Sequence, residues 1–256
     1  MAVEEADTHA PAMLSWALND YSVLLQATNR MAEAEPLMRR ALAISAKSFG
    51  PDHPNVAIRL NNLAQLLKAT NRLAEAEPLM HSALAIDEKN FGPDHPGVAI
   101  DLNNLALLLK HTSRLAEAEP LMRRALDIDE KNFGPDHPNV SIRLNNLALL
   151  LHNTNRLAEA EPLMRRSLAI DEKSFGPDHP NVAVRLNNLA QLLEDTNRQA
   201  EAEPHMRRAL VILRGFLKTT GHPHPELAKF TQNYRLLLEA MGKTPSEIEQ
   251  EIEALS

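Results

Sequence analysis

The stretch of sequence that decides the fold is NNLAQLLKATNRLAEAEPLMHSALAIDEKNFGPDHP, which occupies residues 61–96. It returns with few changes 42 residues later, at residues 103–138. The string FGPDHP begins at four positions separated by a constant 42 residues: Phe49, Phe91, Phe133 and Phe175. An internal period of this length is typical of a solenoid, in which each copy is one supersecondary unit and neighbouring copies bury a continuous core.

Each repeat has the pattern of two amphipathic helices. The first helix is predicted over Pro54–Thr70, because proline suits an initial helical position and apolar residues then recur three, four and seven residues apart. The second is predicted over Leu73–Asn90, and Phe91-Gly92-Pro93 ends it, with the glycine in the left-handed conformation. Pro78 falls inside the second helix, so we expect a tolerated bend and a loosely wound first turn there.

The last repeat departs from the pattern. GHPHPELA at Gly221–Ala228 replaces GPDHPNVA with a few extra residues, and Thr244-Pro245-Ser246-Glu247 resembles a capping box that starts a short helix. Ile248 and Ile252 share one face of that helix, which would cover the end of the stack. We therefore predict one solenoid over residues 1–256. Its repeats lie at roughly 10–50, 54–92, 96–134, 138–176 and 180–217, with a divergent last unit and cap at 223–256.

The spacing inside the repeat resembles the tetratricopeptide repeat family, in its 42-residue form found in kinesin light chains and many bacterial repeat proteins. The resemblance covers about residues 10–241, and Asn71 stands where the family usually has glycine. The family's packing positions fall on Leu60, Leu63, Ala64, Leu67, Ala76, Met80 and Ala83. The resemblance implies an all-α, right-handed superhelix of about six helix pairs with a C-terminal capping helix. No heptad coiled coil is present, which favours a bacterial scaffold, or part of a larger signalling protein, over a motor subunit.

Composition removes several functional classes. The 256 residues include no cysteine, which excludes disulfides and thiolate metal sites, and the net charge of −7 argues against a general nucleic-acid binder. No apolar run approaches the length of a membrane span, and the acidic N-terminal segment lacks the features of a signal peptide. The expectation is a cytoplasmic protein that binds neither nucleic acid nor membrane.

The recurring polar residues do not form a catalytic pattern. A phosphate-binding loop, HExxH and GxSxG are all absent, so we expect no enzyme and no cofactor. The repeated histidines His53, His95, His137 and His179 lie too far apart to share one metal ion, which favours a turn role in which Asp52 or His53 caps the first helix. Arginine pairs such as Arg165-Arg166 indicate solvated faces paired with glutamate, with a phosphate or RNA stripe as the alternative.

The family resemblance implies that the first helix of each pair lines a concave groove. Asparagine pairs recur there beside variable residues, and an amide can both donate to and accept from a peptide backbone. The predicted peptide-binding residues are Asn61, Asn62, Asn103, Asn104, Leu107, Lys110, Asn145, Asn146, Leu149, Asn187, Asn188, Arg143 and Arg185. Two alternatives stay open: the asparagines bond to the neighbouring repeat or to water, and Leu107 and Leu149 pack in the core instead of forming an apolar pocket.

The predicted function is binding of an extended or helical segment of a partner protein. The rival is a structural, oligomerisation or regulatory module, in which the groove meets a second copy or another part of a larger protein. Self-association is therefore the second partner hypothesis.

Overall fold

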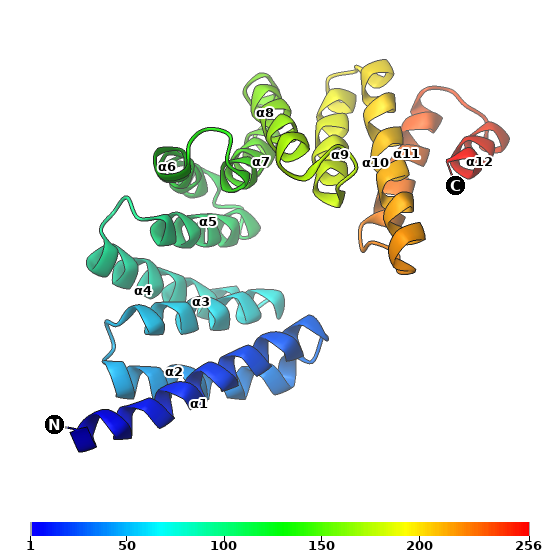
Figure 1. The fold of residues 1–256 in the computed structure, drawn as a ribbon. Coiled ribbons are helices and arrows are strands. Elements are labelled where there is room, and N and C mark those ends of the chain that lie inside the picture. Colours follow the sequence, from blue (N-terminus) through cyan, green and yellow to red (C-terminus); the bar gives the residue numbers. More distant parts are fainter. Residues whose placement is uncertain (1, 256) are drawn as a thin grey trace. The chain divides into compact units, whose positions relative to one another are not determined.

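The computed structural model describes the backbone of residues 2–255 and the side chains from residue 10 onward, and within that range all regular structure is helical. Figure 1 shows the helices in chain order. Their bounds are α1 (Ala2–Ala27), α2 (Met31–Phe49), α3 (Pro54–Ala69), α4 (Leu73–Phe91), α5 (Pro96–His111), α6 (Leu115–Phe133), α7 (Pro138–Asn153), α8 (Leu157–Phe175), α9 (Pro180–Asp195), α10 (Gln199–Thr220), α11 (Leu227–Ala240) and α12 (Pro245–Ala254).

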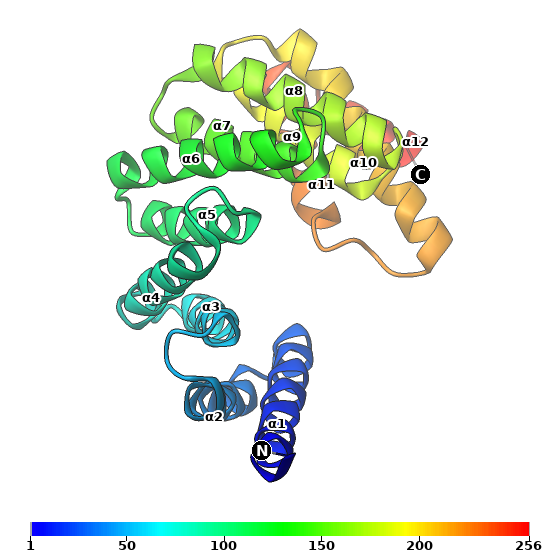
Figure 2. The same cartoon turned by 60° about the vertical axis from the view of Figure 1, so that its left-hand side comes forward.

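The helices form two compact units, Met1–Asn132 and Phe133–Ser256. In the first unit α1 packs on α2 and α3 on α4, while α2 and α4 each contact the first helix of the next pair. In the second unit α7 packs on α8 and α9 on α10, α11 packs on α10, and α12 packs on α11. Consecutive helices run antiparallel within each pair (Figures 1 and 2). The predicted all-α arrangement of helix pairs is confirmed, and the bounds predicted for the two helices of the second repeat each differ from those of α3 and α4 by a single residue.

The repeated histidine starts the first helix of each pair. Nδ1 of His53 accepts a hydrogen bond from the backbone N–H of Asn55 at 3.1 Å, which satisfies one donor of the first turn. The imidazole also stacks on the phenylalanine of the same FGPDHP segment, with ring centroids 4.7 Å apart for Phe49 and His53. The same bond and stack recur at His95, His137 and His179. Of the two predicted candidates, histidine is therefore the cap, and Asp52 pairs with Lys89 at 2.6 Å instead.

Replacing the capping histidine should destabilise the repeat. His137→Ala removes the acceptor at Nδ1 and the stack on Phe133, and we expect a loss of about 1–2 kcal/mol in the free energy of unfolding. His137→Asn keeps a capping oxygen and should recover about half of that loss. Thermal and urea unfolding midpoints measure both variants, and an alanine variant as stable as the parent would contradict the capping role.

Asparagine makes the turn between the two helices of a pair. Asn71 has φ of 59°, and four other residues occupy the same conformation at equivalent turns: Asn29, Ser113, Asn155 and Asn197. The backbone N–H of Arg72 donates to the carbonyl of Leu67 at 2.8 Å, and that of Asn71 donates to Lys68 at 3.0 Å, which is a Schellman-type end. Asparagine tolerates the left-handed region better than most residues, so it takes over the role of the family's usual glycine.

The glycine that ends the second helix adopts a conformation different from the predicted one. Gly92 has φ of 86° and ψ of 162°, outside the left-handed helical region and in a region open essentially to glycine alone. A glycine cap in the left-handed helical region follows α10, at Gly221, where φ is 73° and ψ is 1°. Pro78 lies inside a continuous α4. At the start of that helix the N–H groups of Glu75 and Ala76 both donate to the carbonyl of Arg72, each at 3.2 Å.

The predicted packing residues form the core. Ala64, Ala106, Ala148 and Ala190 have no exposed surface, which allows the paired helices to approach closely. The family packing positions from Leu60 to Ala83 are likewise buried. One cluster joins Val98, Ala99 and Leu102 of α5 to Ala125 and Ile128 of α6, with Leu84 of the preceding pair against it. Each helix pair is therefore stabilised both internally and by its neighbour.

The predicted C-terminal cap is present. Thr244 and Glu247 form the reciprocal hydrogen bonds of a capping box at the start of α12. Ile248 and Ile252 of α12 are buried, at 1% and 5% exposure, and the helix packs against α11. The short helix thus covers apolar surface that α11 would otherwise expose.

Candidate functional site

The first unit has a pocket on the face formed by its first helices. It encloses about 350 Å³ and is lined mainly by α3 and α5, with two contributions from α4. Ile58 and Ile100 supply apolar surface and are 49% and 50% exposed. The remaining lining residues are Pro54, Asn61, Asn62, Gln65, Asp87, Phe91, Gly97, Asp101 and Asn104. Three of the predicted asparagines thus line one cavity in this unit.

The asparagines also bond to one another between repeats. Nδ2 of Asn62 donates to Oδ1 of Asn19 at 2.8 Å, and Nδ2 of Asn188 donates to Oδ1 of Asn145 at 2.9 Å. Asn233 of α11 bonds in the same way to Asn187 at 3.0 Å. Asn103, Asn145 and Asn187 are at most 6% exposed. Both asparagines of a pair therefore take part in contacts between neighbouring repeats, which favours the alternative in which the amides join the repeats.

The other predicted groove residues have two kinds of surroundings. Leu107 and Lys110 of the first unit, and Asn146, Leu149 and Asn188 of the second, are half-buried. Burial lowers the pKa of Lys110. The two predicted arginines lie deeper: Arg143 is 7% exposed, and the Arg185 guanidinium pairs with the buried carboxylate of Asp171 at 2.9 Å. The arginines are thus anchored between helices instead of pointing freely into a groove.

The pocket of the first unit contains two acids where the second unit has an ion pair. Asp171 lies in the last part of α8, and Arg185, 14 residues later, lies in the first half of α9. At the corresponding positions of α4 and α5 are Asp87 and Asp101. Burial and the neighbouring negative charge of Asp87 raise the pKa of Asp101 to about 7, against a hydrogen bond from Asn61 that lowers it. Burial also raises the pKa of Asp87.

Gly97 keeps this acidic cluster open. The other repeats have asparagine at the equivalent position, as Asn55, Asn139 and Asn181. A Cβ atom on Gly97 would lie 3.2 Å from Oδ2 of Asp87 and 3.1 Å from Nδ1 of His95, which is tighter than ordinary contact. Sequence reasoning missed Gly97 and Asp87. Departure from the repeat at positions 97 and 101 of one helix is the signal that could have found Gly97, whereas Asp87 follows the repeat, as Asp129 and Asp171 do.

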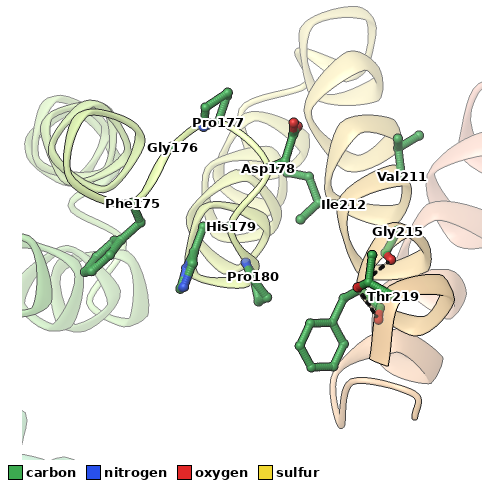
Figure 3. Close-up of a pocket in the computed structure, with 11 residues that line it drawn as sticks. Phe175, Gly176, Pro177, Asp178, His179, Pro180, Val211, Ile212, Gly215 and Thr219 are labelled. Atoms are coloured by element: carbon green, nitrogen blue, oxygen red, sulfur yellow. Dashed lines mark hydrogen bonds between the residues drawn. The ribbon is translucent and has the colours of Figure 1, made fainter. Parts of the chain in front are cut away.

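A second groove lies in the second unit, on the side of the FGPDHP turn. Figure 3 shows it between the α8–α9 connection and the C-terminal half of α10. It encloses about 730 Å³, with apolar surface from Phe175, Val211, Ile212 and Phe216. Gly215 stands where other repeats have the lysine that pairs with the turn aspartate, as Lys173 does with Asp136 at 2.8 Å. The missing lysine side chain leaves the groove open, a departure that the sequence also displays.

The outer arginines are paired with glutamates. Arg165 contacts Glu161 at 2.7 Å within α8, and Arg198 of the next pair contacts the same carboxylate at 2.8 Å. The arrangement recurs in the first unit, where Arg39 and Arg72 both contact Glu35. This supports the predicted solvated, glutamate-paired face. Among the described residues no cluster of three or more His, Asp or Glu suits a metal ion, and no helix combines the length and apolarity needed to cross a bilayer.

Comparison with known proteins agrees with this geometry. The family model described as tetratricopeptide repeat matches residues 13–89, 60–131, 102–173 and 144–215. No curated protein matches the chain.

Solved structures of helical-repeat proteins are similar to it in fold. The chain is 23% identical to kinesin-light-chain TPR-like repeats from Podosopora anserina, covering 82% of this chain and 98% of that one, with a TM-score of 0.67. For BtubC (BKLC) from P. vanneervenii the identity is 24%, the coverage 88% of each chain and the TM-score 0.73. For pilF of Pseudomonas aeruginosa the identity is 20%, the coverage is 96% of this chain and 100% of that one, and the TM-score is 0.58.

The family match spans most of the chain, and the repeat length, the turn residues and the buried small residues all agree with it. Repeats of this kind generally mediate protein–protein interaction. The chain belongs to the tetratricopeptide repeat family.

Proposed function

We propose that the chain binds a segment of a partner protein on the face formed by its first helices. The observation that carries the proposal is a set of large apolar side chains left exposed at equivalent positions 42 residues apart: Trp16, Ile58 and Ile100, at 55%, 49% and 50% exposure. Ile58 and Ile100 lie in the 350 Å³ pocket beside Asn62, Gln65 and Asn104. Exposed apolar groups that recur beside amides suit an extended or helical segment, which offers both side chains and backbone polar groups.

Half-buried amides supply the polar part of this face. Asn104 lines the pocket, and the Oδ1 atom of Asn61 is buried without a hydrogen-bond partner. An acceptor in that condition is costly to leave unpaired, so a ligand N–H group that reaches it gains a hydrogen bond. Asn188 and Asn233 donate to the buried Asn145 and Asn187 and hold the repeats together, so the amide groups offered to the partner are Asn104 and the Oδ1 atom of Asn61.

The test is loss of partner capture through the apolar positions. Ile58→Ser combined with Ile100→Ser should reduce the recovery of the partner at least tenfold in affinity purification from the source cell. The matched control is Val211→Ser, because Val211 is similarly exposed at 48% but lies in the second groove. Quantitative mass spectrometry measures recovery against the parent chain. Full recovery with the double variant, together with loss in the control, would place binding in the second groove.

One observation favours the self-association alternative. Leu14, Tyr21 and Leu24 on α1 are 41%, 50% and 59% exposed. Their equivalents 42 residues later, Val56, Leu63 and Leu66, are at most 4% exposed, and α3, which carries them, contacts α1 and α2 of the preceding pair. The α1 face therefore has the composition of a stacking surface. Light scattering over a range of concentrations distinguishes the two functions, because groove binding predicts no concentration dependence.

A further inference from the structure

The junction between the second and third repeats lacks a cation that the chain supplies elsewhere. In the second unit Arg185 reaches back to the preceding second helix and pairs with Asp171, whose side chain is 1% exposed. The equivalent positions in the first unit hold Asp87 and Asp101, which are 9% and 2% exposed. Two carboxyl groups thus lie where one carboxylate and one guanidinium meet in the regular repeat.

The acids leave buried acceptors without donors. Oδ1 of Asp101 accepts a hydrogen bond from Nδ2 of Asn61 at 2.5 Å. Oδ2 of Asp101, Oδ1 of Asp87 and Oδ1 of Asn61 are buried and have no hydrogen-bond partner. Asp87 and Asp101 also share a side-chain hydrogen bond, which needs a proton on one of the two carboxyl groups. When both groups are ionised they only accept hydrogen bonds, and the cluster then requires donors from outside. Buried polar groups in that state are rare in folded proteins and indicate a group that completes them.

The cavity next to these oxygens has room for a side chain and not only for a small ion. Its 350 Å³ volume continues from the two acids to the exposed isoleucines Ile58 and Ile100 and to Phe91. Gly97 and Asp101 replace an asparagine and an arginine, so the same two substitutions remove bulk and positive charge from one place. One end of the site is therefore formed by the two acids and offers few hydrogen-bond donors, and the other end is apolar surface from Ile58 and Ile100.

We propose that this pocket binds the guanidinium group of an arginine side chain on the partner protein. Arginine carries five N–H donors on a planar head and an apolar stem, which matches the oxygens at one end of the pocket and the isoleucines at the other. The chain itself uses arginine for the same contact at Arg185. The inference rests on the proposed function and names the partner chemistry that this part of the face selects.

The experiment uses small probes and the whole chain. Acetyl-arginine-amide is titrated into ¹⁵N-labelled protein at pH 8, and the backbone amide of Gly97, beside Asp87, reports binding. Acetyl-citrulline-amide is the matched control, because it has the same shape without the charge. We expect millimolar binding of the arginine probe and at least tenfold weaker binding of citrulline. Equal shifts with both probes, or none with arginine, would overturn the proposal.

Two variants separate charge from shape. Asp101→Arg restores the pair found at Arg185 and should abolish probe binding, whereas Asp101→Asn should weaken it about tenfold. Asp52→Asn changes an exposed acid of the same unit, outside the pocket, and should leave binding unchanged. Both Asp101 variants are checked for native amide dispersion. If either Asp101 variant fails to fold, Asp87→Asn is used in its place. Binding that survives in Asp101→Arg would assign the shifts to another site and overturn the proposal.

Two further measurements distinguish failure of this proposal from failure of the proposed function on which it rests. Calcium chloride that displaces the probe at sub-millimolar concentration would identify a metal site and overturn the arginine assignment. Loss of partner capture in the Ile58 and Ile100 double variant, with no binding of the arginine probe, would leave the proposed function standing and remove only the present inference. Probe binding with partner capture unchanged in Asp101→Arg would also overturn it.

Discussion

Asp101→Asn is expected to stabilise the protein at pH 8 by roughly 2–4 kcal/mol and to have a much smaller effect at pH 5. Burial and the charge of Asp87 raise the pKa of the Asp101 carboxyl to about 7 in the folded chain. Ionising it at pH 8 therefore costs folding free energy, and a neutral amide of the same size removes that cost. Asparagine also brings an N–H₂ group next to the unpartnered Oδ1 of Asp87.

The sign follows from where the proton is held. Because the folded pKa of Asp101 lies above the unfolded value, the folded state keeps a proton that the unfolded state releases between about pH 4 and pH 7. The contribution of this carboxyl is present below pH 4 and is lost as the pH rises through 7. Glu88 raises the same pKa further, and the charge of His95 acts on Asp87 in the opposite direction.

Unfolding midpoints in urea at pH 5 and pH 8 measure the effect, as the difference between variant and parent. Taking the difference cancels the contribution of the surface glutamates to the pH dependence of stability. Their pKa values are lowered, as at Glu75 beside Arg72, so their contribution to stability changes with pH in the opposite direction. Asp52→Asn on the exposed turn is the control and should change neither midpoint by more than about 0.5 kcal/mol. An equal gain at both pH values would show that desolvated charge is not the cause.

Removing α12 is expected to destabilise the end of the second unit by about 3–5 kcal/mol and to promote association. The helix buries Ile248 and Ile252, and each buried aliphatic side chain contributes about 1.5–3 kcal/mol. Truncation before Thr244 also removes the contacts of Arg235 with Glu249 and of Lys243 with Glu251, and exposes surface on α11 near Tyr234. A solenoid end without its cap presents apolar surface to a second molecule.

Thermal unfolding and light scattering measure this truncation. The matched control is Thr244→Ala, which removes the capping box but keeps the helix, and should cost only about 1 kcal/mol. A truncated chain with the parent's melting temperature and a monomeric mass would contradict the capping role of α12.

The sequence predicted the repeat architecture because the 42-residue copies act as internal replicates. Apolar spacing located the faces of Leu60, Leu63 and Ala64, and each of them is buried. The FGPDHP segment predicted a turn that starts a helix, and the histidine caps it. Local rules suffice here, because a cap, a Schellman turn and an apolar stripe each depend on residues within two helical turns of one another.

The candidate site was predictable only in part. The spacing placed the asparagines on the first helices, where Asn62 and Asn104 line the pocket. It left open whether the amides meet a peptide or one another, since Asn62 and Asn19 are 43 residues apart and only packing brings them to 2.8 Å. The apolar spacing also did not predict the conformation of Gly92, because its ψ angle depends on how the following helix packs against the preceding one.

The sequence by itself determined the helix pairs, their turns, the buried alanines and the C-terminal cap, because each of these follows from short-range geometry repeated along the chain. Only the tertiary structure decided which polar residues face one another. Asp101 looks like one more variable surface position until α4 places Asp87 against it and Gly97 leaves the space empty. The physical reason is that the pKa of a carboxyl and the cost of an unpaired oxygen are set by neighbours from other helices, which helical periodicity does not identify.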